Sequence, residues 1–164
     1  MSFFESVATS LNMAISLSSL VTFAVYIAVA ATLMALHIKV YTIITPHNEF
    51  ALIRSGNPSA SIALAGAIIG FAIPMANVIS HSISLIDFIV WAVVASCVQL
   101  IVFFIASKVV KGLSDKIIDN DHGAAIFVAS LAIAIGLLNA ACMTPDESAA
   151  NQVVEVQAAQ VAQQ

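Results

Sequence analysis

Charged side chains are scarce in this chain: they make up 9% of its 164 residues, whereas apolar residues make up 61%. A typical soluble domain carries about 25% charged residues, so a water-soluble fold of this length would lack the polar surface to cover so much hydrocarbon. Lysine and arginine number only five. No basic stripe is present to neutralise phosphates, which argues against nucleic acid as a partner.

Patterns that mark catalytic and cofactor sites are also missing. No GxSxG, P-loop or kinase pattern occurs. The four histidines fall at expected helix ends with no metal-ligand spacing, and His47 lies two residues from the carboxylate of Glu49. Cys97 and Cys142 lie in apolar runs and are interpreted as small apolar residues and not as a disulfide. We therefore predict no enzyme, no cofactor and no metal.

Long segments without charged residues are the main feature of the sequence. Asp, Glu, Lys and Arg are absent from residues 6–38, 55–86, 88–107 and 122–145. About 20 apolar residues cross the hydrocarbon layer as a helix, so each run is long enough. We expect transmembrane helices near 14–36, 59–80, 88–107 and 124–143. The predicted fold class is an all-α membrane protein, in which residues 1–144 form a four-helix transmembrane domain of two antiparallel hairpins in the lipid bilayer.

The basic residues indicate how this domain is oriented. All five fall in two connections, at Lys39 and Arg54 and then at Lys108, Lys111 and Lys116. Because cytoplasmic loops carry the excess of Lys and Arg, both connections are predicted to be cytoplasmic and both termini periplasmic. The expected location is the bacterial inner membrane. The Gln/Ala/Val-rich residues 145–164 have no core to join and are expected to be a disordered external tail.

Turn and cap signals lie between the runs. Thr45 and Asn57 each precede a proline and are interpreted as helix N-caps, a pairing in which the missing proline N–H costs nothing. Asp87 is expected to cap the third helix, and residues 49–55 to form a short interfacial helix. Sliding residues 53–79 by 64 positions onto 117–143 aligns several Ala and Ile positions, which suggests an internal repeat of parallel type.

Small residues predict how the helices pack. Gly66 and Gly70 form a GxxxG pattern that gives the second span a smooth face for close backbone approach. The pattern fits packing within one chain or against another copy in a homo-oligomer. Pro74 removes a backbone hydrogen bond from the same helix and is expected to kink it.

Three amide side chains, Asn77, Gln99 and Asn139, are the strongly polar residues within or near the ends of the spans. Each needs a hydrogen-bond partner in lipid. In one interpretation they hold helices together by pairing with each other, with hydroxyls or with the carbonyl that Pro74 frees. In the other they line a polar path or contact a substrate at the centre of an oligomer. No Asp, Glu, Lys or Arg lies deep in a span, which argues against an ordinary proton-coupled carrier.

A family resemblance is carried by residues spread over 20–143. They are 49–57, Ala60, 62–66, Gly70, Phe71, Pro74, Ser82, Asp87, Phe88, Trp91, Gln99, Leu100 and 136–143. With these residues the chain resembles the YjfL family of bacterial inner-membrane proteins. The resemblance implies a four-helix inner-membrane domain of unknown function, with recurring polar positions at Glu49, Asn57, Asp87, Gln99 and Asn139.

Two functions are therefore expected from the sequence. The first is a non-enzymatic scaffold or partner subunit in envelope maintenance, whose loops at 37–58 and 108–122 bind a cytoplasmic protein. The second is an oligomeric pore or small transporter with a polar path lined by Asn77, Gln99 and Asn139.

Overall fold

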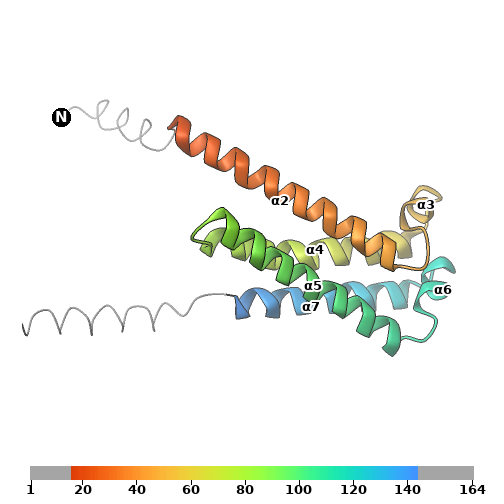
Figure 1. Ribbon diagram of the computed structural model, residues 1–164. Helices are drawn as coiled ribbons and strands as arrows, with labels where there is room; N and C mark the ends of the chain where they lie inside the picture. The colour runs from red at the N-terminus through yellow and green to blue at the C-terminus, as the bar shows by residue number, and fades with distance from the viewer. Residues whose placement is uncertain (1–15, 144–164) are drawn as a thin grey trace, which may run out of the picture.

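The computed structural model describes residues 16–143, and each regular element in that range is an α-helix (Figure 1). The long helices are α2 (Leu17–Ile44), α4 (Pro58–His81), α5 (Leu85–Val109) and α7 (His122–Cys142), and the short ones are α3 (Glu49–Arg54) and α6 (Leu113–Ile118). The four long helices have the length and composition to cross a membrane. This confirms the predicted all-α class with four long apolar helices. The expected tail at 145–164 lies outside the described residues.

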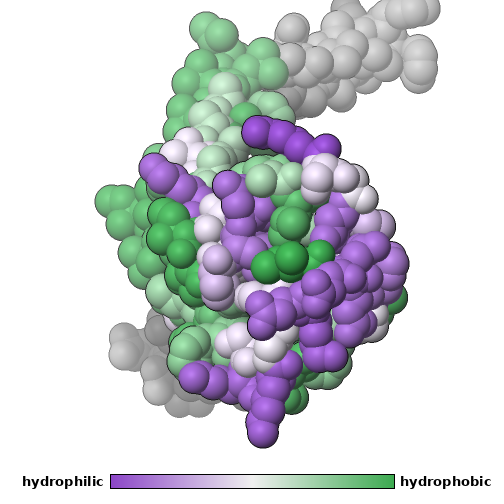
Figure 2. Space-filling view, turned by 90° about the vertical axis from the view of Figure 1, so that its right-hand side faces the viewer, coloured by the Kyte–Doolittle hydropathy of each residue, from purple (hydrophilic) through white to green (hydrophobic). Residues whose placement is uncertain are grey.

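Both short helices lie at one end of the bundle, whereas the start of α2 and the end of α7 lie at the other end (Figure 1). Hydrophilic side chains gather on the end that carries α3 and α6 (Figure 2). The five basic residues, all exposed, are Lys39, Arg54, Lys108, Lys111 and Lys116. The bundle therefore has one polar end, with apolar sides along the long helices.

The first long helix is longer than the sequence analysis predicted. It continues past residue 36 to Ile44, with Lys39 exposed on its surface. A lysine at this depth keeps its stem along apolar surface and its ammonium group in the polar layer, so it does not end the helix. The segment 37–44 therefore belongs to α2 and not to a loop.

Two of the three predicted caps are also corrected. Thr45 ends α2, where its backbone N–H donates to the Tyr41 carbonyl, and Asn48 is the N-cap of α3. Ser84, not Asp87, is the N-cap of α5; the Asp87 N–H donates to the Ser84 hydroxyl, and the Asp87 carboxylate accepts from the Ile83 N–H. The predicted Asn57 cap and the short helix near 49–55 are confirmed.

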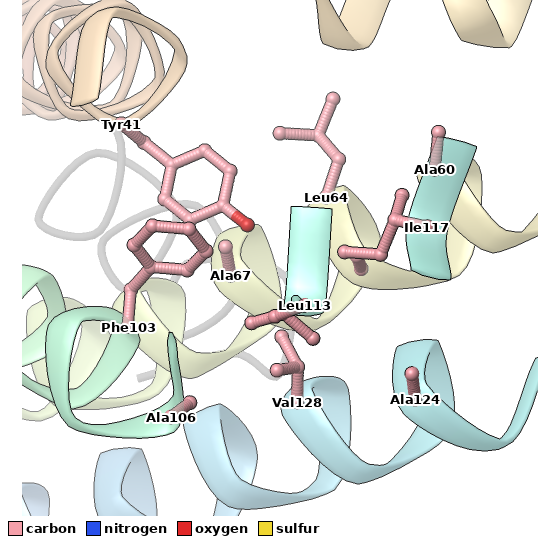
Figure 3. Close-up of a cluster of buried hydrophobic side chains, with 11 residues drawn as sticks. Tyr41, Ala60, Leu64, Ala67, Phe103, Ala106, Leu113, Ile117, Ala124 and Val128 are labelled. Carbon is pink, nitrogen blue, oxygen red and sulfur yellow. The ribbon is translucent and has the colours of Figure 1, made fainter. Parts of the chain in front are cut away.

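Small residues form much of the buried core, which lies mainly along α4. One apolar cluster is near the α3 and α6 end, where Tyr41, Phe103 and Ile117 meet small side chains of α4 and α7 (Figure 3). The other, around Phe71 and Phe88, lies farther along the bundle. The core is therefore built around one central helix.

Candidate functional site

The GxxxG glycines of α4 face α7 of the same chain. A Cβ atom on Gly66 would overlap Ala129, and one on Gly70 would lie 2.6 Å from the Ala132 carbonyl oxygen. A Cβ on Gly136 of α7 would in turn overlap the Gly70 backbone. The contact partners advance together along both helices, so α4 and α7 run in the same direction. At Gly70 and Gly136 the backbones of α4 and α7 are in contact and leave no room for a side chain.

Gln99 reaches this contact from α5. Its amide nitrogen Nε2 donates to the Gly70 carbonyl at 2.7 Å and to the Ala132 carbonyl at 3.2 Å. The Gly70 carbonyl is the acceptor that Pro74 leaves without a helical donor, because proline has no N–H to offer four residues on. Gln99, which is 4% exposed, therefore replaces the missing bond and joins three helices at one point.

The other two amides lie at the far ends of α4 and α7. Asn77 donates from Nδ2 to the Ala140 carbonyl at 2.9 Å, which ties the two helices together again. Asn139 has a buried Nδ2 without a hydrogen-bond partner. Asn77 and Gln99 thus make contacts between helices of one chain.

A second polar group is at the polar end, where α2 gives way to α3. His47 and Glu49 are 8% and 1% exposed, and His47 Nε2 lies 3.0 Å from Glu49 Oε1. This is an ion-pair distance, but the two groups are not aligned as a hydrogen bond. Glu49 also interacts electrostatically with Tyr41, whose hydroxyl is buried without a hydrogen-bond partner.

The sequence analysis missed His37, because it expected the first helix to stop at residue 36. The structure buries His37 at 3% exposure, with Nδ1 at 2.8 Å from the Ser96 hydroxyl and its ring stacked on Phe71. Together with Tyr41 and Gln99 it lines a cavity of about 10 Å³, which is near the lower limit for one water molecule. The spacing of His37 and Tyr41, one helical turn apart, was the available signal.

The remaining family-pattern positions hold the ends of helices. Asn57 caps α4 with its oxygen and donates from Nδ2 to the carbonyls of Ile117 and Ile118, so it ties α4 to α6. Asp87 lies in the first turn of α5 and lines a cavity of about 260 Å³ with Trp91 and Cys142. Within residues 16–143, no group of three or more His, Cys, Asp and Glu side chains is arranged to hold a metal ion.

The class of the protein follows from this geometry: it is a multi-pass membrane protein in which Asn77 and Gln99 join the helices. A family model described as Domain of Unknown Function (DUF350) matches residues 14–143. The chain is 36% identical over 128 residues to the UPF0719 inner membrane protein YjfL of Escherichia coli (strain K12), a match that covers 78% of this chain and 97% of the relative. The relative of the same name from Escherichia coli O157:H7 gives the same values.

The chain therefore belongs to the DUF350 family of inner-membrane proteins, and the predicted family is confirmed. No solved structure matches it.

Proposed function

We propose that this chain is a non-enzymatic partner subunit of the bacterial inner membrane, a scaffold in envelope maintenance that recruits a cytoplasmic protein to its α3 and α6 end. The main support is that Asn77 and Gln99 are engaged in helix contacts within one chain, so they are not available to line a path. The polar surface of α3 and α6 is then the face that a soluble partner can reach (Figure 2).

Apolar side chains on that polar end favour a protein partner. Phe50 of α3 and Ile118 of α6 are each 46% exposed, among exposed charges of both signs that include Arg54 and Asp115. An apolar centre with a charged rim is the usual composition of a protein interface. The proposed partner therefore contacts exposed side chains of the segments 37–58 and 108–122, which include the end of α2 and the helices α3 and α6.

Site-specific photocrosslinking in native membranes tests this proposal. A crosslinker at Phe50 or Ile118 is expected to give one discrete protein adduct, and Arg54→Glu is expected to weaken it without lowering the level of the chain. Leu137 is the control, because it is 56% exposed on α7 and its expected neighbour is lipid. Identical adducts at all three positions, or none at Phe50 and Ile118, would exclude the partner.

The proposed orientation places α3 and α6 in the cytoplasm and both termini in the periplasm. It is supported by the exposure of all five basic residues in the segments at that end. A reporter that is active only in the periplasm should be active after Gln164 and inactive at Leu113. The reverse result would refute this orientation.

We also propose that α2–α4 and α5–α7 are the two units of a parallel repeat, each an antiparallel hairpin. The helix bounds support this repeat, because a shift of 64 residues places α3 (Glu49–Arg54) on α6 (Leu113–Ile118) without a gap. Positive φ angles occur at the corresponding Gly56 and Asn120, and the next residue in each unit is an N-cap.

A pore is the second function that the sequence raised. It requires a homo-oligomer in which amides of several copies face one path. Native mass spectrometry of the solubilised chain separates the two functions, because a strict monomer is incompatible with the pore and compatible with the partner subunit.

A further inference from the structure

A cavity of about 260 Å³ lies where the end of α4, the start of α5 and the end of α7 meet. This is the end of the bundle away from α3 and α6 (Figure 1). Apolar and polar side chains share its lining, which includes Val78, His81, Ser82, Asp87, Trp91 and Met143. The proposed partner subunit function makes no use of this cavity, so its mixed lining calls for a separate explanation.

The carboxylate of Asp87 gives the cavity a negative charge that no Lys or Arg side chain balances. Residues 55–107 contain no other Asp, Glu, Lys or Arg, and the five basic residues lie in the segments at the α3 and α6 end. Among the described residues 16–143, Asp87 Oδ2 accepts from the Ile83 N–H at 3.2 Å, and the carboxylate forms no ion pair. A charge beside apolar surface is poorly screened, so this cavity attracts a cation.

Two other lining groups can accept hydrogen bonds. His81 Nδ1 lies 2.9 Å from the Asn77 carbonyl oxygen. A carbonyl oxygen can only accept, so Nδ1 carries the hydrogen, and in the neutral imidazole Nε2 is then an acceptor. The Ser82 hydroxyl is buried without a hydrogen-bond partner. A cation that donates several hydrogen bonds therefore matches this lining.

The apolar part of the lining favours an organic cation over a metal ion. The face of an indole ring attracts ammonium groups, and Trp91 lines the cavity. In the part of the chain that the structure describes, no group of three or more His, Cys, Asp and Glu side chains is arranged to hold a metal ion. Sites for drug-sized ligands measure about 300–1,000 Å³, so a cavity below that range takes a smaller group.

We propose that this cavity binds a primary ammonium group, which donates to the Asp87 carboxylate while its carbon atoms lie against Trp91 and Val78. His81 and Ser82 supply further acceptors for its three N–H donors. The group can belong to the ethanolamine headgroup of a phospholipid or to a free amine, since both share this chemistry. The site is independent of the proposed partner, because it lies at the other end of the bundle.

The test uses the fluorescence of Trp91, which is the single tryptophan of the chain. The full-length protein in phosphatidylcholine nanodiscs is titrated with ethanolamine hydrochloride at neutral pH and constant ionic strength. We expect a saturable change in Trp91 emission, and none with ethylene glycol, which is uncharged, or with tetramethylammonium, which has no N–H donor. Asp87→Asn should weaken ethanolamine binding at least about tenfold. The matched control is Asp115→Asn, an exposed carboxylate of α6, which should leave binding unchanged.

Nanodiscs of phosphatidylethanolamine distinguish the two sources of the ammonium group. If the lipid headgroup binds, Trp91 emission differs between the two lipids before any amine is added, and Asp87→Asn removes the difference. If a free amine binds, emission is the same in both lipids and changes when ethanolamine is added. Either result supports a primary ammonium site.

The proposal would be overturned if ethanolamine gave no saturable change and the two lipids gave the same emission. An equal response to tetramethylammonium or to magnesium chloride would also overturn it, because a cation without N–H donors would then suffice. The same holds for an unchanged response in Asp87→Asn. If that variant does not accumulate, the comparison of ethanolamine with tetramethylammonium in the unchanged chain still decides.

Discussion

The helices α2 and α4 are both long and apolar, but they differ greatly in how they are packed. In α2 only Ala30, His37 and Tyr41 of 28 residues are buried, whereas α4 buries eleven of 24. Large side chains such as Phe23, which is 66% exposed, cover α2. The face of α4 toward α7 is instead built from Gly and Ala.

The difference shows what hydropathy leaves open in a membrane. Lipid tails are as apolar as leucine, so burial of apolar surface does not draw helices together in the bilayer. Close backbone approach and hydrogen bonds between helices must do so, and both are concentrated at Gly70, where Gln99 donates and Gly136 touches. The position of α2 depends on fewer contacts, and one of its three buried residues, His37, is polar.

The largest expected effect is at the closest contact. Gly70→Val would place a branched side chain against the Ala132 carbonyl, which is backbone and cannot move aside. We expect a loss of more than about 3 kcal/mol and a chain that fails to accumulate in membranes. The control is Ala31→Val on the exposed face of α2, which should accumulate normally. Equal levels of the two variants would show that α4 and α7 do not touch as described.

The second-largest effect is expected when a buried aromatic side chain is removed. Phe71 of α4 is 1% exposed and stacks on His37, so Phe71→Ala should cost about 3 kcal/mol and loosen α2. Phe23→Ala is the matched change on the exposed face of α2, where we expect less than about 0.5 kcal/mol. Unfolding in mixed detergents measures both. Similar losses in the two variants would mean that the exposed face of α2 is packed against protein.

Loss of the Gln99 bridge should have a smaller effect. Gln99→Leu removes both donations from Nε2 and should cost about 1 kcal/mol. Pro74→Ala would restore the helical donor to the Gly70 carbonyl. In that background Gln99→Leu should cost less, a coupling that a double-mutant cycle measures. Additive losses would show that Gln99 does not substitute for the bond that proline removes.

The smallest effect is expected at the start of α7. The pKa of Asp121 is held below its ordinary value, first by the Ala124 N–H and then by Lys116. A carboxyl group with a lowered pKa in the folded state stabilises above its ordinary pKa, and this contribution is lost as pH falls through the folded value. Hydrogen exchange in the first turn of α7 should therefore speed up at acid pH, after correction for the intrinsic rates.

The matched variant for this prediction is Asp121→Asn, which keeps a good N-cap and removes the charge. The dependence of exchange on pH should disappear in that variant. If it persists, another group is responsible for the acid effect. The N-cap of α2, Ser16, provides the comparison within the chain, since it does not titrate and its helix should show no such acid step.

Much of the fold could be predicted from residue patterns. Uncharged runs predicted the long helices to within about three residues for α4, α5 and α7, and the short helix near 49–55 was found as α3. The predicted end of the first helix was wrong, because Lys39 was taken as a helix boundary and α2 continues to Ile44. That error also hid His37, since a histidine at a helix end gives no sign of burial. Which carbonyl Gln99 would bind depended on how three helices meet.

Composition alone therefore determined that this chain lies in a membrane as long helices, because hydrocarbon accepts only long uncharged segments whose backbone bonds are internal. It could not determine which helix would be central, since the four are similarly apolar. The tertiary structure decided that through the backbone contact of α4 with α7 at Gly70. This contact joins residues that are distant in sequence, and such proximity does not appear in a local pattern.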